Sequence, residues 1–230
     1  MRLRWIPQRI VETWRYHGGR AMLSLLLDRS VYRLLRLTVI NVVWLDATRV
    51  RSTAHDDARF TFRFLAVDEV REFAADPANQ LQPPFVERSA VGRDLCFAAV
   101  IGGTLAAYGW YALEAIEAEH AFGVAMSFPG YVAYMYNGFT HADFRGARLH
   151  GAIMTQALQQ LAERGITKLV SLVDWTNAAS MQSCYRSGYE LLGQIVLMRL
   201  PMRDLVIAPR RAKALGIRFG EEARRRRAGE

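Results

Sequence analysis

The sequence predicts an α/β fold, of the α+β kind, in which a mixed sheet has helices packed against it. Hydrophobic residues make up 51% of the 230 residues and charged residues 23%, which is typical of a globular protein with a substantial core. Strand-like and helix-like segments alternate along the middle of the chain in the order β-α-β-β-β-α-β-α-β. The length suits one large domain with extensions at its ends.

The first fifty residues predict a basic helical extension followed by a strand. In residues 1–35, apolar side chains recur at roughly helical spacing. Such a segment can pack on the core or lie on an anionic membrane face, and packing is the favoured interpretation. Residues 37–45 are rich in β-branched side chains and predict a strand. Charged residues interrupt the apolar stretch 21–46, so no transmembrane helix is predicted.

The next elements lead to a hairpin. Alternating apolar residues predict a strand over 59–67, and a helix with acidic residues in its first turn begins at Asp68. Prolines and polar residues predict a long loop over 77–94. Two apolar segments, 95–103 and 104–113, meet at a Gly-Gly pair, which predicts a β-hairpin.

The second half reads as strands that alternate with helices. The predicted elements are a strand over 130–140, a helix from Leu149 to its glycine cap at Gly165, a buried strand over 168–175, a short helix between Asn177 and Gly188, and closing strands over 189–200.

Charge divides the chain into three parts, with a net charge of +8 overall. Residues 1–55, the N-terminal extension that we expect to pack on the core, hold ten basic and three acidic residues. Residues 56–200, the predicted domain, hold 11 basic and 15 acidic residues. Residues 201–230, predicted as a partly disordered tail, hold nine basic and four acidic residues. Basic ends favour an anionic partner such as a membrane surface, or serve only solubility, and no nucleic-acid-reading motif is present.

The two cysteines, Cys96 and Cys184, form no CxxC pair and no His/Cys cluster. The sequence therefore predicts neither a metal site nor a disulfide framework. This cysteine usage fits a reducing compartment. We expect a cytoplasmic protein, with peripheral placement at the inner membrane face if the basic ends bind lipid.

Residues 140–151, THADFRGARLHG, join the strand over 130–140 to the following helix. A helix that begins after a glycine-containing turn presents unpaired N–H groups and a positive dipole end, which together bind phosphate. Gly146 leaves room for a ligand, and Arg145 and Arg148 add guanidinium groups suited to phosphate oxygens. The turn therefore predicts an anion site, with a solvated basic loop as the alternative.

A second constellation, NAASMQSCYRSGYE, directly follows the strand over 168–175. Asn177 can cap the helix that it begins and also offer its amide to a ligand. Tyr185 lies eight residues later, about two helical turns along the same face. The alternative for Tyr185 is a half-buried packing role.

Together the two stretches resemble the GCN5-related N-acetyltransferase (GNAT) superfamily, over roughly 140 residues. In the turn, Phe144, Arg145 and Gly146 match the coenzyme A motif. The sequence departs from that motif at Arg148, where a glycine is usual, and at His150, where a small residue is usual. In the second stretch the matching residues are Asn177, Ser180, Tyr185, Gly188 and Tyr189.

The resemblance implies a mixed, mostly antiparallel central sheet flanked by helices, with an acyl-CoA site and no metal. It implies that acetyl-CoA, or a longer acyl-CoA, contacts these residues: Asn137, Gly138, Phe139, Thr140, Arg145, Gly146, Ala147, Arg148, Leu149, His150, Gly151, Asn177 and Ser180. The implied activity is transfer of an acyl group, acetyl above all, to an amine of a small molecule or peptide. The alternative is a catalytically inactive protein that binds coenzyme A or serves as a scaffold, and a homodimer fits either.

The resemblance also assigns proton transfers. Tyr185 would protonate the leaving thiolate. The candidates for the base that deprotonates the amine are Glu114, His141, Asp143 and Asp174. Asp174 is favoured because it ends a buried strand beside the acceptor end of the sheet, although capping of the following turn explains it equally well.

Overall fold

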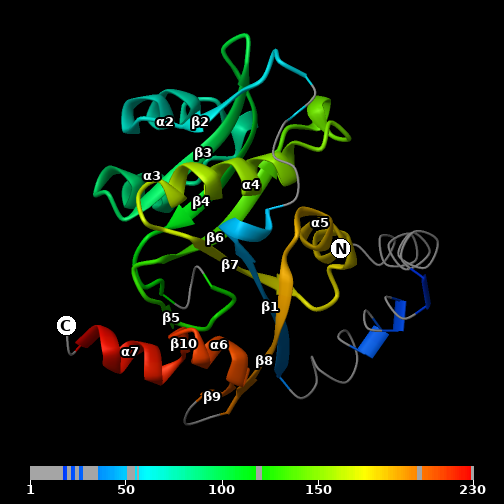
Figure 1. Cartoon of the computed structure of the whole chain (residues 1–230), viewed down its shortest axis with the longest axis vertical. Coiled ribbons are helices and arrows are strands. Elements are labelled where there is room, and N and C mark those ends of the chain that lie inside the picture. The colour runs from blue at the N-terminus through cyan, green and yellow to red at the C-terminus, as the bar shows by residue number, and fades with distance from the viewer. Residues whose placement is uncertain are drawn as a thin grey trace.

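A computed structural model of the whole chain gives the arrangement of its helices and strands (Figure 1). The structure describes residues 36–50, 55, 57–117, 121–200 and 204–228, and the pairs 18–19, 22–23 and 26–27. The predicted helices of residues 1–35 lie almost entirely outside these ranges. Within the described ranges, no helix has both the length and the apolar character needed to cross a bilayer.

The described residues form a central sheet of eight strands in the order β2-β3-β4-β6-β7-β1-β8-β9. The strands are β1 (Leu37–Asp46), β2 (Thr61–Phe64), β3 (Asp94–Ile101), β4 (Thr104–Ala112), β6 (Val132–Thr140), β7 (Lys168–Asp174), β8 (Glu190–Arg199) and β9 (Asp204–Ile207). All neighbours are antiparallel except β6 and β7, which are parallel. The predicted mixed, mostly antiparallel sheet is confirmed.

Strand β1 lies inside the sheet, between β7 and β8. Ile40 pairs with Asp174 on one side and with Ile195 on the other. Six of its ten residues are buried and the other four half-buried, because its β-branched and leucine side chains face hydrophobic cores on both faces of the sheet. The division of the chain at residue 55 stays a prediction, but β1 joins the sheet across that boundary.

Helices cover both faces of the sheet and enclose two hydrophobic cores. The main helices are α2 (Val67–Ala74), α3 (Pro83–Ala90), α4 (Leu149–Ala162) and α5 (Ala178–Ser187). On one face α2 and α3 bury Val70 and Phe85, and on the other α4 and α5 bury Ile153 and Cys184. Figure 1 shows α4 crossing β4 and β6, with α5 beside β1 and β8.

The prediction of a long loop over 77–94 is wrong. The segment holds the 3-10 helix η3 (Pro77–Asn79) and helix α3. Pro83 and Pro84 occupy the first turn of α3, where a proline ring fits and its missing N–H would have no partner. Prolines that read as loop signals therefore start a helix, whose Phe85 and Ser89 are buried.

Residues 204–228 of the predicted C-terminal tail form strands and helices, and partial disorder of the tail stays a prediction. Strand β9 extends the central sheet, and a small sheet and two helices follow: β10 (Arg218–Phe219) paired with β5 (Met126–Ser127), α6 (Arg210–Ala214) and α7 (Glu221–Ala228). Ala212, Ile217 and Phe219 are buried in the core that α2 and α3 share. Because basic residues outnumber these apolar side chains, the amino-acid composition of the segment did not predict that it packs on the core.

Candidate functional site

The parallel strands β6 and β7 separate partway along their length. They pair from Val132 with Lys168 to Met135 with Ser171, and their pairing ends there although both strands continue. Beyond this point β6 bulges at Asn137 and Gly138, two residues that face Gly109 alone on β4. Asn137 takes a left-handed conformation with φ 43°. The sheet thus opens between β6 and β7, with Asn137 and Gly138 exposed beside the opening.

A tight turn connects β6 to α4. The 3-10 helix η5 (Ala142–Phe144) begins it, and successive backbone bonds fold the chain back, from Phe144 N to His141 O (3.0 Å) and from Ala147 N to Phe144 O (3.3 Å). Gly146 follows with φ 90°, and a Cβ added there would meet nothing within 4 Å. Any other residue would be strained at this φ and would fill the open space beside the turn.

Helix α4 begins with unpaired backbone donors. Within the described chain, no acceptor is found for these N–H groups: Gly146, Arg148, Leu149, His150 and Gly151. Arg148, the N-cap residue, offers no side-chain bond and has φ 58°, which costs a residue with a side chain about 1–2 kcal/mol. Several aligned donors and the dipole of a 14-residue helix favour an anion here.

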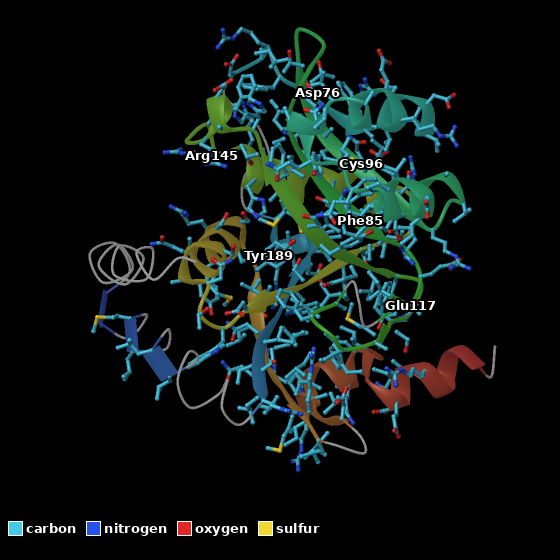
Figure 2. All side chains as sticks on the ribbon, turned by 180° about the vertical axis from the view of Figure 1, so that it is seen from behind. Asp76, Phe85, Cys96, Glu117, Arg145 and Tyr189 are labelled. Atoms are coloured by element: carbon cyan, nitrogen blue, oxygen red, sulfur yellow. The ribbon has the colours of Figure 1, made fainter. Side chains whose placement is uncertain are left out.

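The residues that carry these donors line an open hollow of about 1190 Å³, together with two other parts of the described chain. The lining comes from His55, Asp57 and Phe60, from the turn with the start of α4, and from the end of α5. Its guanidinium groups belong to Arg145, Arg148 and Arg186, all exposed and without an ion pair among the described residues. Figure 2 shows Arg145 pointing outward from the turn. Unpaired N–H donors and guanidinium groups thus lie around one hollow, and that they bind an anion stays a prediction.

His150 replaces a small residue of the family motif, and the fold accommodates its ring. The imidazole lies against Gly138, where an added Cβ would sit 2.9 Å from His150 Cε1. Burial lowers the pKa of His150, so the ring is neutral at pH 7. Gly138 provides the space that the larger side chain at 150 requires.

The second predicted stretch has the expected local structure. Asn177 caps α5, and its side-chain oxygen accepts from the Ser180 N–H at 3.1 Å. Gly188 ends the helix with φ 97°. A Cβ at Gly151 would lie 3.2 Å from Ser187 Oγ, so α4 and α5 approach closely. The amide oxygen of Asn177 is engaged in this cap, and its predicted contact with coenzyme A stays a prediction.

The structure does not bring Tyr185 and Asp174 to the hollow at the turn. Tyr185, 46% exposed, lines a second hollow with Arg49 and Glu190. In the sheet, Glu190 of β8 lies opposite Trp44 of β1, close to the end at which β7 begins. The opening between β6 and β7 lies toward the other end of β7. The Asp174 carboxylate accepts hydrogen bonds from the N–H and the hydroxyl of Thr176, at 2.8 and 2.5 Å, and so holds the turn after β7.

Of the other candidate bases, Glu114 and Asp143 are exposed and His141 is half-buried. Glu114 is 3.9 Å from Arg93, and its side chain is 67% exposed. His141 and Asp143 lie together in the turn, with 3.4 Å between Nδ1 and Oδ2. Of the predicted residues on β6, Thr140 lines the hollow and Phe139 stacks on Tyr108 with 5.4 Å between ring centroids.

Sequence reasoning missed the contributions of His55 and Arg186. Arg186 is adjacent to Tyr185 in the second stretch, and its position on the face toward α4 could have been found from helical spacing. His55 precedes β2, and its ring Nε2 lies 2.7 Å from the carbonyl oxygen of Ala147. No local pattern links residues 92 positions apart.

Comparison with known proteins finds matches to solved structures but none to family models or curated sequences. One similar structure is a GCN5-related glucosamine N-acetyltransferase region of a fungal multi-domain GH3 β-N-acetylglucosaminidase, with 14% identity and a TM-score of 0.50 over 68% of this chain and 20% of that chain.

Two further matches are bacterial. A Novosphingobium aromaticivorans structure described as belonging to the GNAT family has 16% identity and a TM-score of 0.49, over 70% of this chain and 63% of that chain. A GCN5-related N-acetyltransferase-like protein from Streptococcus suis has 13% identity and a TM-score of 0.48, over 78% of this chain and 67% of that chain. This chain thus spans less than two thirds of the Novosphingobium structure. At these identities the likeness concerns the fold, and the chain has the mixed α/β fold of the GCN5-related N-acetyltransferases.

Proposed function

We propose that the protein is an acyltransferase that moves an acyl group, acetyl above all, from acyl-CoA to an amine of a small molecule or peptide. One observation supports this most directly. Five backbone N–H groups and three guanidinium groups, all unpaired within the described chain, lie around one hollow at the start of α4. Donors at a helix N-terminus and arginine forks both favour phosphate oxygens, and a diphosphate can use several of them at once.

The opening beside this hollow suits the rest of the ligand. Among the described strands, none pairs with β6 on the side of β7 beyond Met135. An extended arm that contains amide groups can pair with such a free strand edge as another strand would. When bound, the thioester would supply an activated acyl group, and the bulge at Asn137 and Gly138 would lie beside it.

Binding should depend on the conformation of the turn, and Gly146→Ala tests this. The added methyl group forces a strained φ of 90° and occupies open space beside the unpaired donors. We expect it to weaken CoA binding in calorimetry about tenfold, since about 1.4 kcal/mol corresponds to that factor. Gly165→Ala is the matched control, because Gly165 follows the other end of α4 with φ 82° and equally open surroundings.

Gly165→Ala should bind CoA as the unaltered protein does. Equal weakening by both substitutions would mean that general destabilisation, and not the turn, governs binding. If the unaltered protein gives no heat with CoA or acetyl-CoA, the proposal is wrong.

Turnover is tested by thiol release from acetyl-CoA across a panel of amines. Tyr185 as acid and Asp174 as base stay predictions of the family resemblance, since neither residue lines the hollow at the turn. If they hold these roles, Tyr185→Phe and Asp174→Asn should each lower kcat at least about tenfold. CoA affinity should stay unchanged in both variants. Binding of CoA without thiol release from any amine would instead favour a CoA-binding protein that lacks turnover.

A further inference from the structure

We propose that His55 is a positioning residue, which holds the peptide between Ala147 and Arg148 in the orientation that the anion site requires. The inference rests on the proposed function, because it concerns the same turn. His55 does not belong to either sequence stretch that indicated the site, and it reaches the turn from the segment before β2.

In the hydrogen bond between His55 and the turn, His55 is the donor. Nε2 of His55 lies 2.7 Å from the carbonyl oxygen of Ala147. A carbonyl oxygen only accepts, so Nε2 carries the proton and donates. Nδ1 faces the other way and accepts from the N–H of Asp57 at 3.2 Å. The imidazole is thus fixed at both nitrogens.

Aromatic packing holds the imidazole against the turn. The His55 ring meets Phe60 edge-on at 5.1 Å and Phe62 at 5.4 Å between centroids. Phe60 in turn meets Phe144, within the turn itself, edge-on at 5.9 Å. The distance between His55 and the turn is therefore set by packing as well as by the hydrogen bond.

Rotation of the peptide between Ala147 and Arg148 out of this orientation would relieve backbone strain. Arg148 has φ 58°, a conformation that is unfavourable for a residue with a side chain. A half-turn of the peptide plane changes ψ of Ala147 and φ of Arg148 together, and so removes the positive φ. The cost of this φ is similar to the net contribution of one hydrogen bond, so the bond from His55 can decide the balance.

The rotation would damage an anion site. In a trans peptide the C=O and the N–H point in opposite directions. While the Ala147 carbonyl points at His55, the Arg148 N–H points away from it, as one of the unpaired donors. After rotation the carbonyl oxygen would take the place of that donor and repel a phosphate. His55, which lines the same hollow, therefore keeps a donor in place through the peptide that it holds.

The proposal predicts that His55 and Arg148 are coupled, because a glycine at 148 takes φ 58° without strain. The experiment measures calorimetric affinity for CoA and for inorganic pyrophosphate. His55→Ala is compared alone, with Arg148→Ala and with Arg148→Gly. Both substitutions at 148 remove the guanidinium group, so they differ only in the cost of the left-handed conformation.

We expect His55→Ala to weaken binding about tenfold alone and again on the Arg148→Ala background, but less than about twofold on the Arg148→Gly background. His55→Gln, which retains an N–H donor, should bind within about threefold of the unaltered protein. Melting temperatures are measured for all variants. If His55→Ala does not fold, His55→Gln is the test variant. Whatever affinity for CoA His55→Gln loses should then be regained on the Arg148→Gly background.

The outcomes separate the two proposals. No heat from the unaltered protein with CoA would overturn the proposed function and this inference together. Full affinity in His55→Ala would overturn the inference alone. Equal losses on the alanine and glycine backgrounds would also overturn it, because His55 would then act independently of the peptide at 148.

Discussion

At the scale of single residues, a buried ion pair holds the strand that opens to form the site. The Asp94 carboxylate is fully buried and accepts from Arg88 at 2.6 and 2.7 Å. It also accepts the hydroxyl of Tyr136. Burial and the nearby Asp94 raise the pKa of Tyr136, so the phenol stays protonated. Because Tyr136 directly precedes the bulge at Asn137, the Arg88–Asp94–Tyr136 network anchors β6 where it leaves β7.

Replacement of Arg88 by methionine should be strongly destabilising. It leaves the Asp94 carboxylate buried without its cation, which typically costs about 3–5 kcal/mol of unfolding free energy. Arg71→Met is the control, because Arg71 pairs with Asp68, whose side chain is 92% exposed, and should change stability by less than about 1 kcal/mol. Urea unfolding measures both variants, and similar losses would contradict a special role for the buried pair.

The sequence located the residues of the turn but not their partners. Residues 145–151 were found because a strand, a glycine and a helix start follow one another in the chain. His55 was missed because its contact with Ala147 depends on how distant segments pack. For Tyr185, the sequence predicted the helix but not the direction of the side chain. The rotation of α5 places the Tyr185 ring in a second hollow.

At the scale of elements, most boundaries follow from local patterns. The hairpin of β3 and β4, helix α4 and helix α5 lie where apolar periodicity and the capping residues predicted them. Helix α4, however, ends at Ala162 with Glu163 as its C-cap, before the predicted cap at Gly165. Helix α3 was missed because prolines mark loops and helix starts alike. The central place of β1 was not predicted, because a strand sequence does not specify which distant strands it pairs with.

The end of β1 is joined to the start of β7 by a salt bridge, which should make stability depend on pH. Burial raises the pKa of Asp46, but hydrogen bonds from Lys168 and Thr48 outweigh it, so the pKa lies below its usual value. A carboxyl group whose pKa is lowered by folding stabilises the fold above its unfolded pKa, about 4, and loses this contribution as the pH falls through the folded value.

We therefore expect Asp46→Asn to be less stable than the unaltered protein between about pH 6 and 8, with the difference shrinking below about pH 4. Thermal unfolding across this pH range measures the effect. A difference that stays constant down to pH 2 would contradict a contribution from the charged pair.

At the scale of the whole molecule, the two faces of the sheet keep both thiols from solvent. Cys96 belongs to the core under α2 and α3, and Cys184 to the core under α4 and α5. Burial raises the pKa of Cys184 to about 11 and raises that of Cys96 as well. Since the thiolate is the reactive form, both cysteines should be inert in the folded protein.

A thiol-reactive disulfide reagent at pH 7.5 should thus modify neither cysteine within minutes in the folded protein. After unfolding in guanidinium chloride it should modify both. Rapid reaction of Cys184 alone under native conditions would show that the α5 side opens on this timescale.

The place of β1 has a consequence for biosynthesis. This strand leaves the ribosome before its two neighbours, β7 and β8, which begin at Lys168 and Glu190. A nascent chain that ends before residue 168 therefore exposes an apolar strand with two unsatisfied edges, a state prone to aggregation. We expect the sheet to close only after β7 and β8 have been synthesised, so chaperones should bind β1 during translation.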